Sequence, residues 1–174
     1  GFARDPLLVW RFYAQRRAAL VGIEANDAHR ALAALEARLG DRFLLVTQNI
    51  DGLHRAAGSE RLIELHGDLM RSRCSRCARP PFEDRQVYRP NVAPLCGRCH
   101  AEGKDALLCP DVVWFGEPID RGYLARIEAF VVAAGSALVF LAIGTSGLVE
   151  PAASLVDAAR TVGGRSWLVN AEPP

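Results

Sequence analysis

Four apolar runs that each end in short polar residues constrain the fold of this chain more than any other feature. Helical patterns separate the runs, and strands that alternate with helices are typical of an α/β fold with a parallel sheet. Ligands bind outside the carboxyl ends of the strands in such sheets. We therefore predict a parallel, nucleotide-binding α/β sheet with strands at residues 42–47, 61–65, 137–143 and 166–169.

The first two of these strands bring polar groups to one rim of the predicted sheet. Asn49 and Asp51 follow the strand at 42–47, and His66 follows the next strand along the chain. An amide, a carboxylate and an imidazole would then share the rim where a ligand binds. Asn and Asp also favour turns, so the same residues fit a plainer interpretation as strand-ending turns.

Helices are expected where a capping residue precedes an apolar pattern of helical period. Asp5 and Pro6 open such a pattern, in which Leu8 and Phe12 recur with helical spacing. The helices predicted on these grounds cover residues 5–20, 26–40 and 120–134.

The first helix carries a candidate receptor for a carboxylate. Tyr13 and Arg16 are three residues apart, so both side chains lie on one face of the helix. A guanidinium binds a carboxylate through a two-pronged contact, and a phenol adds a hydrogen bond. The alternative is the solvated edge of an ordinary amphipathic helix.

Two Cys-x-x-Cys pairs separated by eighteen residues predict one closed, structural zinc site. Four thiolates complete a tetrahedral ion, so no position stays open for catalysis. We expect the arginines around the pairs to offset the negative charge of the four thiolates, and a nucleic-acid patch is the alternative. The predicted ligands are Cys74, Cys77, Cys96 and Cys99; the arginines are Arg71, Arg73, Arg76, Arg79 and Arg98.

Two further segments indicate binding of a ligand. Residues 110–117 have the β-branched and aromatic content of a strand. Gly144, Thr145 and Ser146 follow the strand at 137–143 and precede a helix that we expect to begin near Pro151. Backbone N–H groups and hydroxyls at a helix N-terminus favour anions such as phosphate.

Composition excludes several classes of protein. Half of the 174 residues are hydrophobic and the net charge is +1, which favours a folded chain and argues against nucleic-acid binding. Residues 129–149 are apolar enough to suggest a membrane span, but glycine-containing segments interrupt them and predict a helix followed by a buried strand. Five cysteines, four of them in metal-type spacing, favour a reducing compartment.

Together these motifs resemble those of the sirtuins, a family of NAD-dependent protein-lysine deacylases. They occur in sirtuin order over essentially the whole chain, at residues 47–51, 64–67, the two cysteine pairs, 112–117, 144–146 and 169–172. The resemblance implies a Rossmann-like parallel sheet with a small zinc-ribbon and helical lobe, and a cleft between the lobes for NAD and an acylated lysine. It implies a helical segment lining the acyl pocket at 1–40, a discontinuous NAD-binding lobe at 41–69 and 105–174, and a zinc-binding module at 70–104.

The resemblance also implies roles for individual residues. His66 would be the general base of a reaction that yields free lysine, nicotinamide and O-acyl-ADP-ribose. The implied NAD-binding residues are Gln48, Asn49, Asp51, Gly144, Thr145, Ser146, Asn170, Ala171 and Glu172. The implied substrate-binding residues are Val113, Trp114, Phe115, Gly116, Gly147 and Leu148, which would clasp the peptide as an added strand, and Tyr13 and Arg16, whose spacing is similar to that of sirtuins preferring succinyl, malonyl or glutaryl groups.

The chain departs from the sirtuin pattern at both ends. The family's first strand and its Gly-Ala-Gly-x-Ser loop do not precede Gly1, and the closing strand does not follow Pro174. We therefore expect a chain truncated at both ends, with an incomplete sheet, weak binding of NAD and poor activity on its own.

The sequence-based expectations extend to partners and alternatives. We expect acylated-lysine proteins as substrates, no membrane or nucleic-acid partner, a monomer and a cytoplasmic location. The alternatives are an ADP-ribosyltransferase that uses the same cleft and His66, and an inactive fragment that acts only as a zinc-containing binding module.

Overall fold

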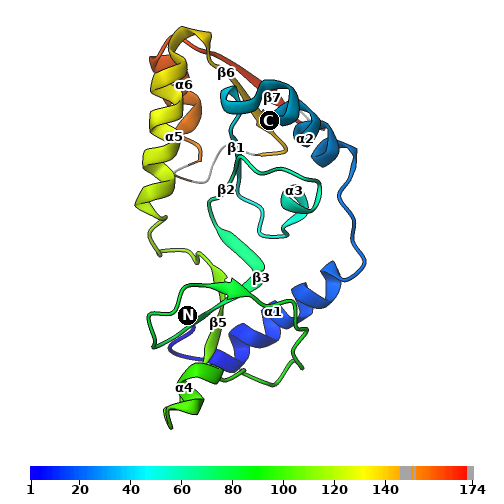
Figure 1. Cartoon of the computed structure of the whole chain (residues 1–174), viewed down its shortest axis with the longest axis vertical. Coiled ribbons are helices and arrows are strands. Elements are labelled where there is room, and N and C mark those ends of the chain that lie inside the picture. The colour runs from blue at the N-terminus through cyan, green and yellow to red at the C-terminus, as the bar shows by residue number, and fades with distance from the viewer. Residues whose placement is uncertain (146–149, 151, 172–174) are drawn as a thin grey trace. The chain divides into compact units, whose positions relative to one another are not determined.

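A computed structural model describes residues 1–145, 150 and 152–171 of the chain (Figure 1). The chain divides into two compact units, Gly1–Ile119 and Asp120–Pro174, and each is described by itself. Within the described ranges, no helix is both long and apolar enough to cross a membrane.

In the Gly1–Ile119 unit, a parallel pair of strands leads into the polar residues predicted at the rim of the sheet. Strand β1 pairs with β2 so that Thr47 lies opposite Glu64, and every residue of β2 is buried. On the neighbouring helix α2, the Glu36 carboxylate accepts the N–H groups of Glu60 (3.0 Å) and Arg61 (2.7 Å), just before β2 begins. These elements are β1 (Leu45–Thr47), β2 (Leu62–Glu64), α2 (Asp27–Leu39), η1 (Gly40–Arg42) and α3 (Leu53–Ala56).

An antiparallel sheet in the order β4-β3-β5 forms the other part of this unit. Helix α1 packs against it, and the Trp10 indole donates to the carbonyl oxygen of Leu108 at 2.7 Å. Trp10 belongs to a buried cluster with Cys96, Cys99 and Leu108, so the cysteine pairs lie next to the core of this sheet. These elements are α1 (Pro6–Leu20), β3 (Gly67–Cys74), β4 (Phe82–Glu83), α4 (Gly97–Ala101) and β5 (Leu108–Val112).

The Asp120–Pro174 unit contains a second parallel pair, β6 with β7, whose register places Ile143 opposite Val169. Helix α6 contacts both strands. Asp120 caps helix α5 by accepting the N–H groups of Gly122 (2.7 Å) and Tyr123 (3.2 Å). The elements are α5 (Arg121–Ala134), η2 (Gly135–Ala137), β6 (Val139–Ile143), α6 (Leu155–Thr161) and β7 (Arg165–Val169).

The fold confirms the predicted parallel α/β character and corrects several local predictions. The helices at 5–20, 26–40 and 120–134 are present with Asp5, Asn26 and Asp120 as caps. The strand predicted at 110–117 is present but shorter and shifted, because β5 covers Leu108–Val112 and a turn follows. The helix expected near Pro151 begins at Leu155.

The buried face of α1 also differs from the one predicted. Leu8 is 57% exposed and Phe12 is 45% exposed, whereas Trp10, Ala14 and Arg17 are buried. The guanidinium of Arg17 finds a complete set of polar partners inside the protein. These partners allow Arg17 to be buried, although the apolar pattern of the helix predicts an exposed position for it.

Candidate functional site

His66 lies directly after β2 and is held at both its ring and its backbone. Its Nδ1 is 3.1 Å from the carbonyl oxygen of Gln48, which follows β1. Because a carbonyl oxygen can only accept, Nδ1 carries the hydrogen and Nε2 keeps the lone pair. The backbone carbonyl of His66 accepts the N–H of Val113 at 2.9 Å. The imidazole is therefore oriented as a base that acts through Nε2.

The residue after His66 must be glycine. Gly67 has φ +83°, and a Cβ at this position would overlap the carbonyl oxygen of Asp111 on β5. The close approach of the two backbones lets β3 begin immediately after the histidine. Gly67 therefore fixes where the histidine lies relative to the end of β5.

The predicted NAD-binding segment after β1 folds as a tight polar loop. Thr47 Oγ1 accepts the N–H of Asn49 at 3.1 Å, and Asp51 Oδ1 accepts the N–H of Leu53 at 2.9 Å, which starts α3. The side chain of Asn49 is exposed. The loop thus presents Asn49 to solvent beside the segment that orients His66, while Asp51 also has a structural role at the start of α3.

In the Asp120–Pro174 unit, the ends of β6 and β7 bring together some of the other residues predicted to bind NAD. The Gly144 N–H donates to the carbonyl oxygen of Val169 at 2.9 Å, and the Asn170 amide donates to the carbonyl oxygen of Thr145 at 3.0 Å. Ala171 follows directly. The other members assigned to this part of the chain, Ser146, Gly147, Leu148 and Glu172, lie outside the described residues.

The candidate acyl-binding pair on α1 contacts different neighbours. The Tyr13 hydroxyl accepts the indole N–H of Trp114 at 2.8 Å. Burial raises the pKa of Tyr13, while the hydrogen bond from Trp114 and the charge of Arg16 oppose that increase. Arg16 is exposed, and its guanidinium lies 3.4 Å from the centre of the Phe12 ring. Stacking on a ring leaves the N–H edges of a guanidinium free for a carboxylate.

The predicted peptide-binding segment follows β5 as a turn. The Glu117 N–H donates to the carbonyl oxygen of Trp114 at 2.8 Å, and Phe115 at the tip of the turn is fully exposed. Sequence reasoning did not find the contact of Trp114 with Tyr13, since 101 residues separate the two positions. No local spacing in the sequence signals that contact.

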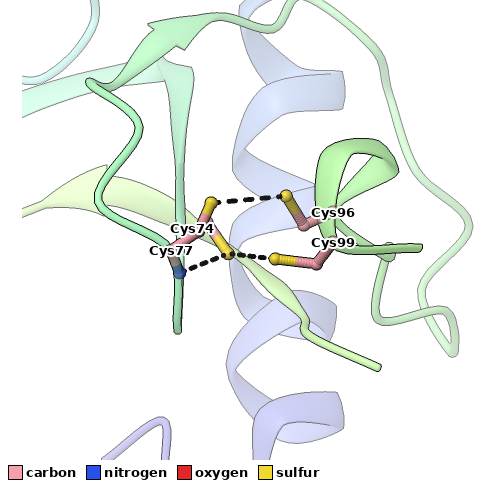
Figure 2. Close-up of side chains that lie close together, drawn as sticks. All are labelled: Cys74, Cys77, Cys96 and Cys99. Carbon is pink, nitrogen blue, oxygen red and sulfur yellow. Dashed lines mark hydrogen bonds between the residues drawn. The ribbon is translucent and has the colours of Figure 1, made fainter. Parts of the chain in front are cut away.

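Figure 2 shows the four predicted zinc ligands turned toward one another. Cys74 ends β3, Cys77 lies in the following turn, and Cys96 and Cys99 lie at the start of α4. All four Sγ atoms lie within 4.8 Å of one another, with 3.7 Å between Cys74 and Cys99 and 3.9 Å between Cys77 and Cys96. Zinc–sulfur bonds of about 2.3 Å in a tetrahedron place the sulfurs about 3.8 Å apart. The cysteine tetrad therefore fits a structural zinc ion.

Backbone N–H groups lie close to the cysteine sulfurs. The N–H groups of Arg76 and Cys77 both lie 3.3 Å from Cys74 Sγ. A backbone hydrogen bond from Cys99 lowers the pKa of the Cys96 thiol, which favours the thiolate that a zinc ion needs. Local folding of the two knuckles thus directs backbone hydrogen bonds at the sulfurs of Cys74 and Cys96.

The arginines expected to balance the thiolates have other partners in the structure. Arg71 lies 3.8 Å from Asp111, and Arg73 lies 3.3 Å from Glu117. Arg79 stacks on Phe82. These contacts show carboxylate and aromatic partners for the side chains, so the proposed balancing of thiolate charge stays a prediction.

Comparison with known proteins gives one consistent family. Residues 1–151 match the Sir2 family. The chain is 47% identical over 173 residues to the "NAD-dependent protein deacylase" of Aeropyrum pernix, which covers 99% of this chain and 66% of that protein.

Solved structures agree with this match. A Sir2 homologue in complex with NAD superimposes with a TM-score of 0.86 at 40% identity, covering 98% of this chain and 63% of that one. A mutant Sir2 homologue in complex with 2′-O-acetyl ADP-ribose gives a TM-score of 0.85 at 39% identity, covering 99% of this chain and 65% of that one. The chain therefore spans less than two thirds of the length of these proteins.

Proposed function

Because this chain belongs to the Sir2 family, we propose that the protein containing it removes acyl groups from protein lysines with NAD as co-substrate. The observation that carries the proposal is the fixed imidazole of His66. Its Nδ1 donates to the Gln48 carbonyl, and its backbone carbonyl binds the Val113 N–H. One held histidine thus joins the segment expected to bind NAD to the segment expected to bind the peptide.

The proposed chemistry assigns proton transfer to His66. The acyl oxygen attacks the ribose carbon of NAD as nicotinamide leaves. A ribose hydroxyl then attacks the acyl carbon, and a water molecule completes the release of free lysine and O-acyl-ADP-ribose. With Nδ1 committed to a carbonyl, His66 accepts a proton from a ribose hydroxyl at Nε2. Histidine is the side chain that most often serves as a general base.

Polar groups at the strand ends form the proposed NAD contacts. In the first unit these are Gln48, Asn49 and Asp51. In the second unit the residues after β6 and β7 would contact the phosphates and adenosine, since ligands of such sheets bind outside the carboxyl ends of the strands. The proposed contacts there are Gly144, Thr145, Ser146, Asn170, Ala171 and Glu172.

We propose an acidic acyl group, such as succinyl, malonyl or glutaryl, as a preferred substrate. Within the described part of the chain, Arg16 forms no ion pair with a carboxylate, so its charge is available to a ligand. The stacking of Arg16 on Phe12 limits where its N–H edges point. Tyr13 adds a hydroxyl three residues earlier on the same helix.

The proposal also covers organisation and location. We assign residues 1–40 to the acyl-pocket segment, 41–69 and 105–174 to the NAD-binding lobe, and 70–104 to the zinc module. The proposed peptide-clasping residues are Val113, Trp114, Phe115, Gly116, Gly147 and Leu148. All five cysteines are free, which suits a reducing compartment such as the cytoplasm, and a monomer is proposed.

Incubating the full-length protein with radiolabelled NAD and an acetylated or succinylated peptide tests the reaction. We expect the label in O-acyl-ADP-ribose, with loss of this product in His66→Ala. Label that stays on protein would identify an ADP-ribosyltransferase instead. Label left in unreacted NAD with both peptides would contradict any catalytic function and support a binding module.

The acyl class is tested by Arg16→Met. Loss of the guanidinium removes the partner of the distal carboxylate, so kcat/KM for a succinylated peptide should fall about 10- to 100-fold more than that for an acetylated one. Arg11→Met is the matched control, because it removes another exposed arginine from α1. Equal losses on both peptides in Arg16→Met would refute the assignment.

A further inference from the structure

Trp114 and Tyr13 form a side-chain contact between the proposed peptide-binding turn and the proposed acyl pocket. The indole Nε1–H donates to the Tyr13 hydroxyl at 2.8 Å, and the ring centres are 6.4 Å apart. Within the described ranges, this indole is the one hydrogen-bond partner of that hydroxyl. The contact therefore determines whether the Tyr13 hydroxyl offers a ligand a hydrogen-bond donor or an acceptor.

Contacts other than Tyr13 hold Trp114 in place. The Phe2 ring stacks on the indole, with centres 5.9 Å apart and planes 10° from parallel. The backbone N–H of Trp114 donates to the Glu117 carboxylate at 3.2 Å. The Arg73 guanidinium lies 5.3 Å from the indole and pairs with the same carboxylate. The position of the indole N–H is thus set by its own turn and its neighbours.

A phenol hydroxyl can donate one hydrogen bond and can also accept. When the indole N–H occupies an acceptor site of Tyr13, the capacity directed at a ligand is donation of the hydroxyl hydrogen. Accepting a hydrogen bond from one partner also strengthens donation to the next. A carboxylate offers only acceptor oxygens, so it suits such a hydroxyl better than a neutral acyl tail does.

We propose that Trp114 is a positioning residue for acyl selectivity, which makes Tyr13 a hydrogen-bond donor toward the carboxylate of an acidic acyl group. The proposal rests on the proposed function and extends it to a residue outside the Tyr13/Arg16 pair. It also gives Trp114 a second role besides contact with the peptide, since one side chain connects the turn after β5 to α1.

The test is a double-mutant cycle in the full-length enzyme, with kcat/KM measured on succinylated and acetylated forms of one peptide. Trp114→Phe keeps an aromatic ring and removes the N–H. We expect the succinyl-to-acetyl ratio of kcat/KM to fall about fivefold, the effect of one hydrogen bond. In a Tyr13→Phe background, Trp114→Phe should leave the ratio unchanged. Any loss of folded enzyme or of peptide contact common to both substrates cancels in the ratio.

Phe2→Leu is the control for packing, since it weakens the stack on the indole and keeps the N–H. We expect it to change the ratio less than twofold, within the smallest effect assigned to a hydrogen bond. Should Trp114→Phe not fold, 3-benzothienylalanine at position 114 keeps the bicyclic ring without the N–H and carries the same expectation.

Three results would overturn the inference. They are an unchanged ratio in Trp114→Phe, an equal fall of the ratio in the Tyr13→Phe background, and an equal fall in Phe2→Leu. A parent enzyme that deacylates neither peptide would overturn the proposed function together with this inference. A parent active on both peptides whose ratio ignores Trp114 would overturn this inference alone.

Discussion

Substitution of Arg17 by methionine should unfold the protein at much lower denaturant concentration. Arg17 is completely buried and donates from all three guanidinium nitrogens. Its acceptors are the carbonyl oxygens of Leu69 (2.8 Å), Gln86 (3.1 Å) and Arg71 (3.1 Å), and the hydroxyl of Ser72 (3.1 Å). One side chain of α1 thus satisfies backbone groups on β3 and on the segment after β4.

The charge of Arg17 is also paired inside the protein. Its guanidinium lies 3.2 Å from the carboxylate of Asp84, whose side chain is 6% exposed. Tyr88 donates to the same carboxylate at 3.1 Å, and burial together with the Asp84 charge raises the pKa of Tyr88 to about 12. The rings of Trp10 and Tyr88 lie 5.1 and 5.6 Å from the guanidinium.

These contacts set the magnitude of the effect. Removing one partner of a buried ion pair costs about 3–5 kcal/mol, because the other charge stays buried without compensation. Each carbonyl left without a donor costs about 1–3 kcal/mol, and such losses are not additive within one cluster. We therefore expect Arg17→Met to lower the free energy of unfolding by about 3–5 kcal/mol, a large share of the roughly 5–15 kcal/mol of a typical domain.

Urea unfolding of the full-length protein in the presence of zinc measures this loss. Arg17→Met combined with Asp84→Leu should regain part of the stability, since no buried charge is then left alone. Hydrogen exchange should increase first in residues 67–74 and 82–88. Arg11→Met, on the exposed face of α1, serves as the control. A loss below about 1 kcal/mol, or strictly additive losses in the double variant, would refute the reasoning.

Three further predictions follow from individual residues. Gly67→Ala should lower the free energy of unfolding by about 2–3 kcal/mol by thermal or urea unfolding, because the new Cβ would overlap the Asp111 carbonyl; an unchanged value would show that the backbone can relax. Cys96→Ser should reduce bound zinc from one ion to none by metal analysis, and a chelator should lower the melting temperature of the parent but not of the variant. Burial, and then the charge of His29, lower the pKa of His54. Its contribution to stability is therefore present above about pH 6.5 and is lost as pH falls below that value toward the lower pKa of the folded state. His54→Gln should flatten this part of the plot of unfolding free energy against pH, and an unaltered plot would exclude the effect.

Elements with local signals could be predicted from the sequence. Asp5, Asn26 and Asp120 cap their helices through their own side chains, so the signal and the structure lie within a few residues. The four cysteines were found because each knuckle fixes its pair by spacing alone. By contrast, β3 carries several polar residues, and partners far along the chain satisfy them, as Arg17 does for Ser72.

The site residues also differ in whether a local sequence signal or a distant contact defines them. His66 was identifiable because it follows an apolar strand within a motif. Its tautomer depends on the carbonyl of Gln48, eighteen residues earlier, and only pairing of β1 with β2 brings that group close. The role of Trp114 toward Tyr13 likewise depends on packing of α1 near the end of β5.

Arg17 shows why apolar periodicity chose the wrong face of α1. Trp10, Ala14 and Arg17 follow the i, i+4, i+7 spacing of a buried helical face, but a hydrophobicity count scores an arginine against burial. A guanidinium becomes an interior group only when several acceptors surround it, and here they come from chain segments more than fifty residues away. Trp10, at the start of this spacing, is the one local signal for the buried face. A buried face built on Leu8 and Phe12 would leave Trp10 on the exposed side of the helix. A helix that pairs a large aromatic residue with an arginine seven positions later should therefore be tested for a buried cation before its face is assigned.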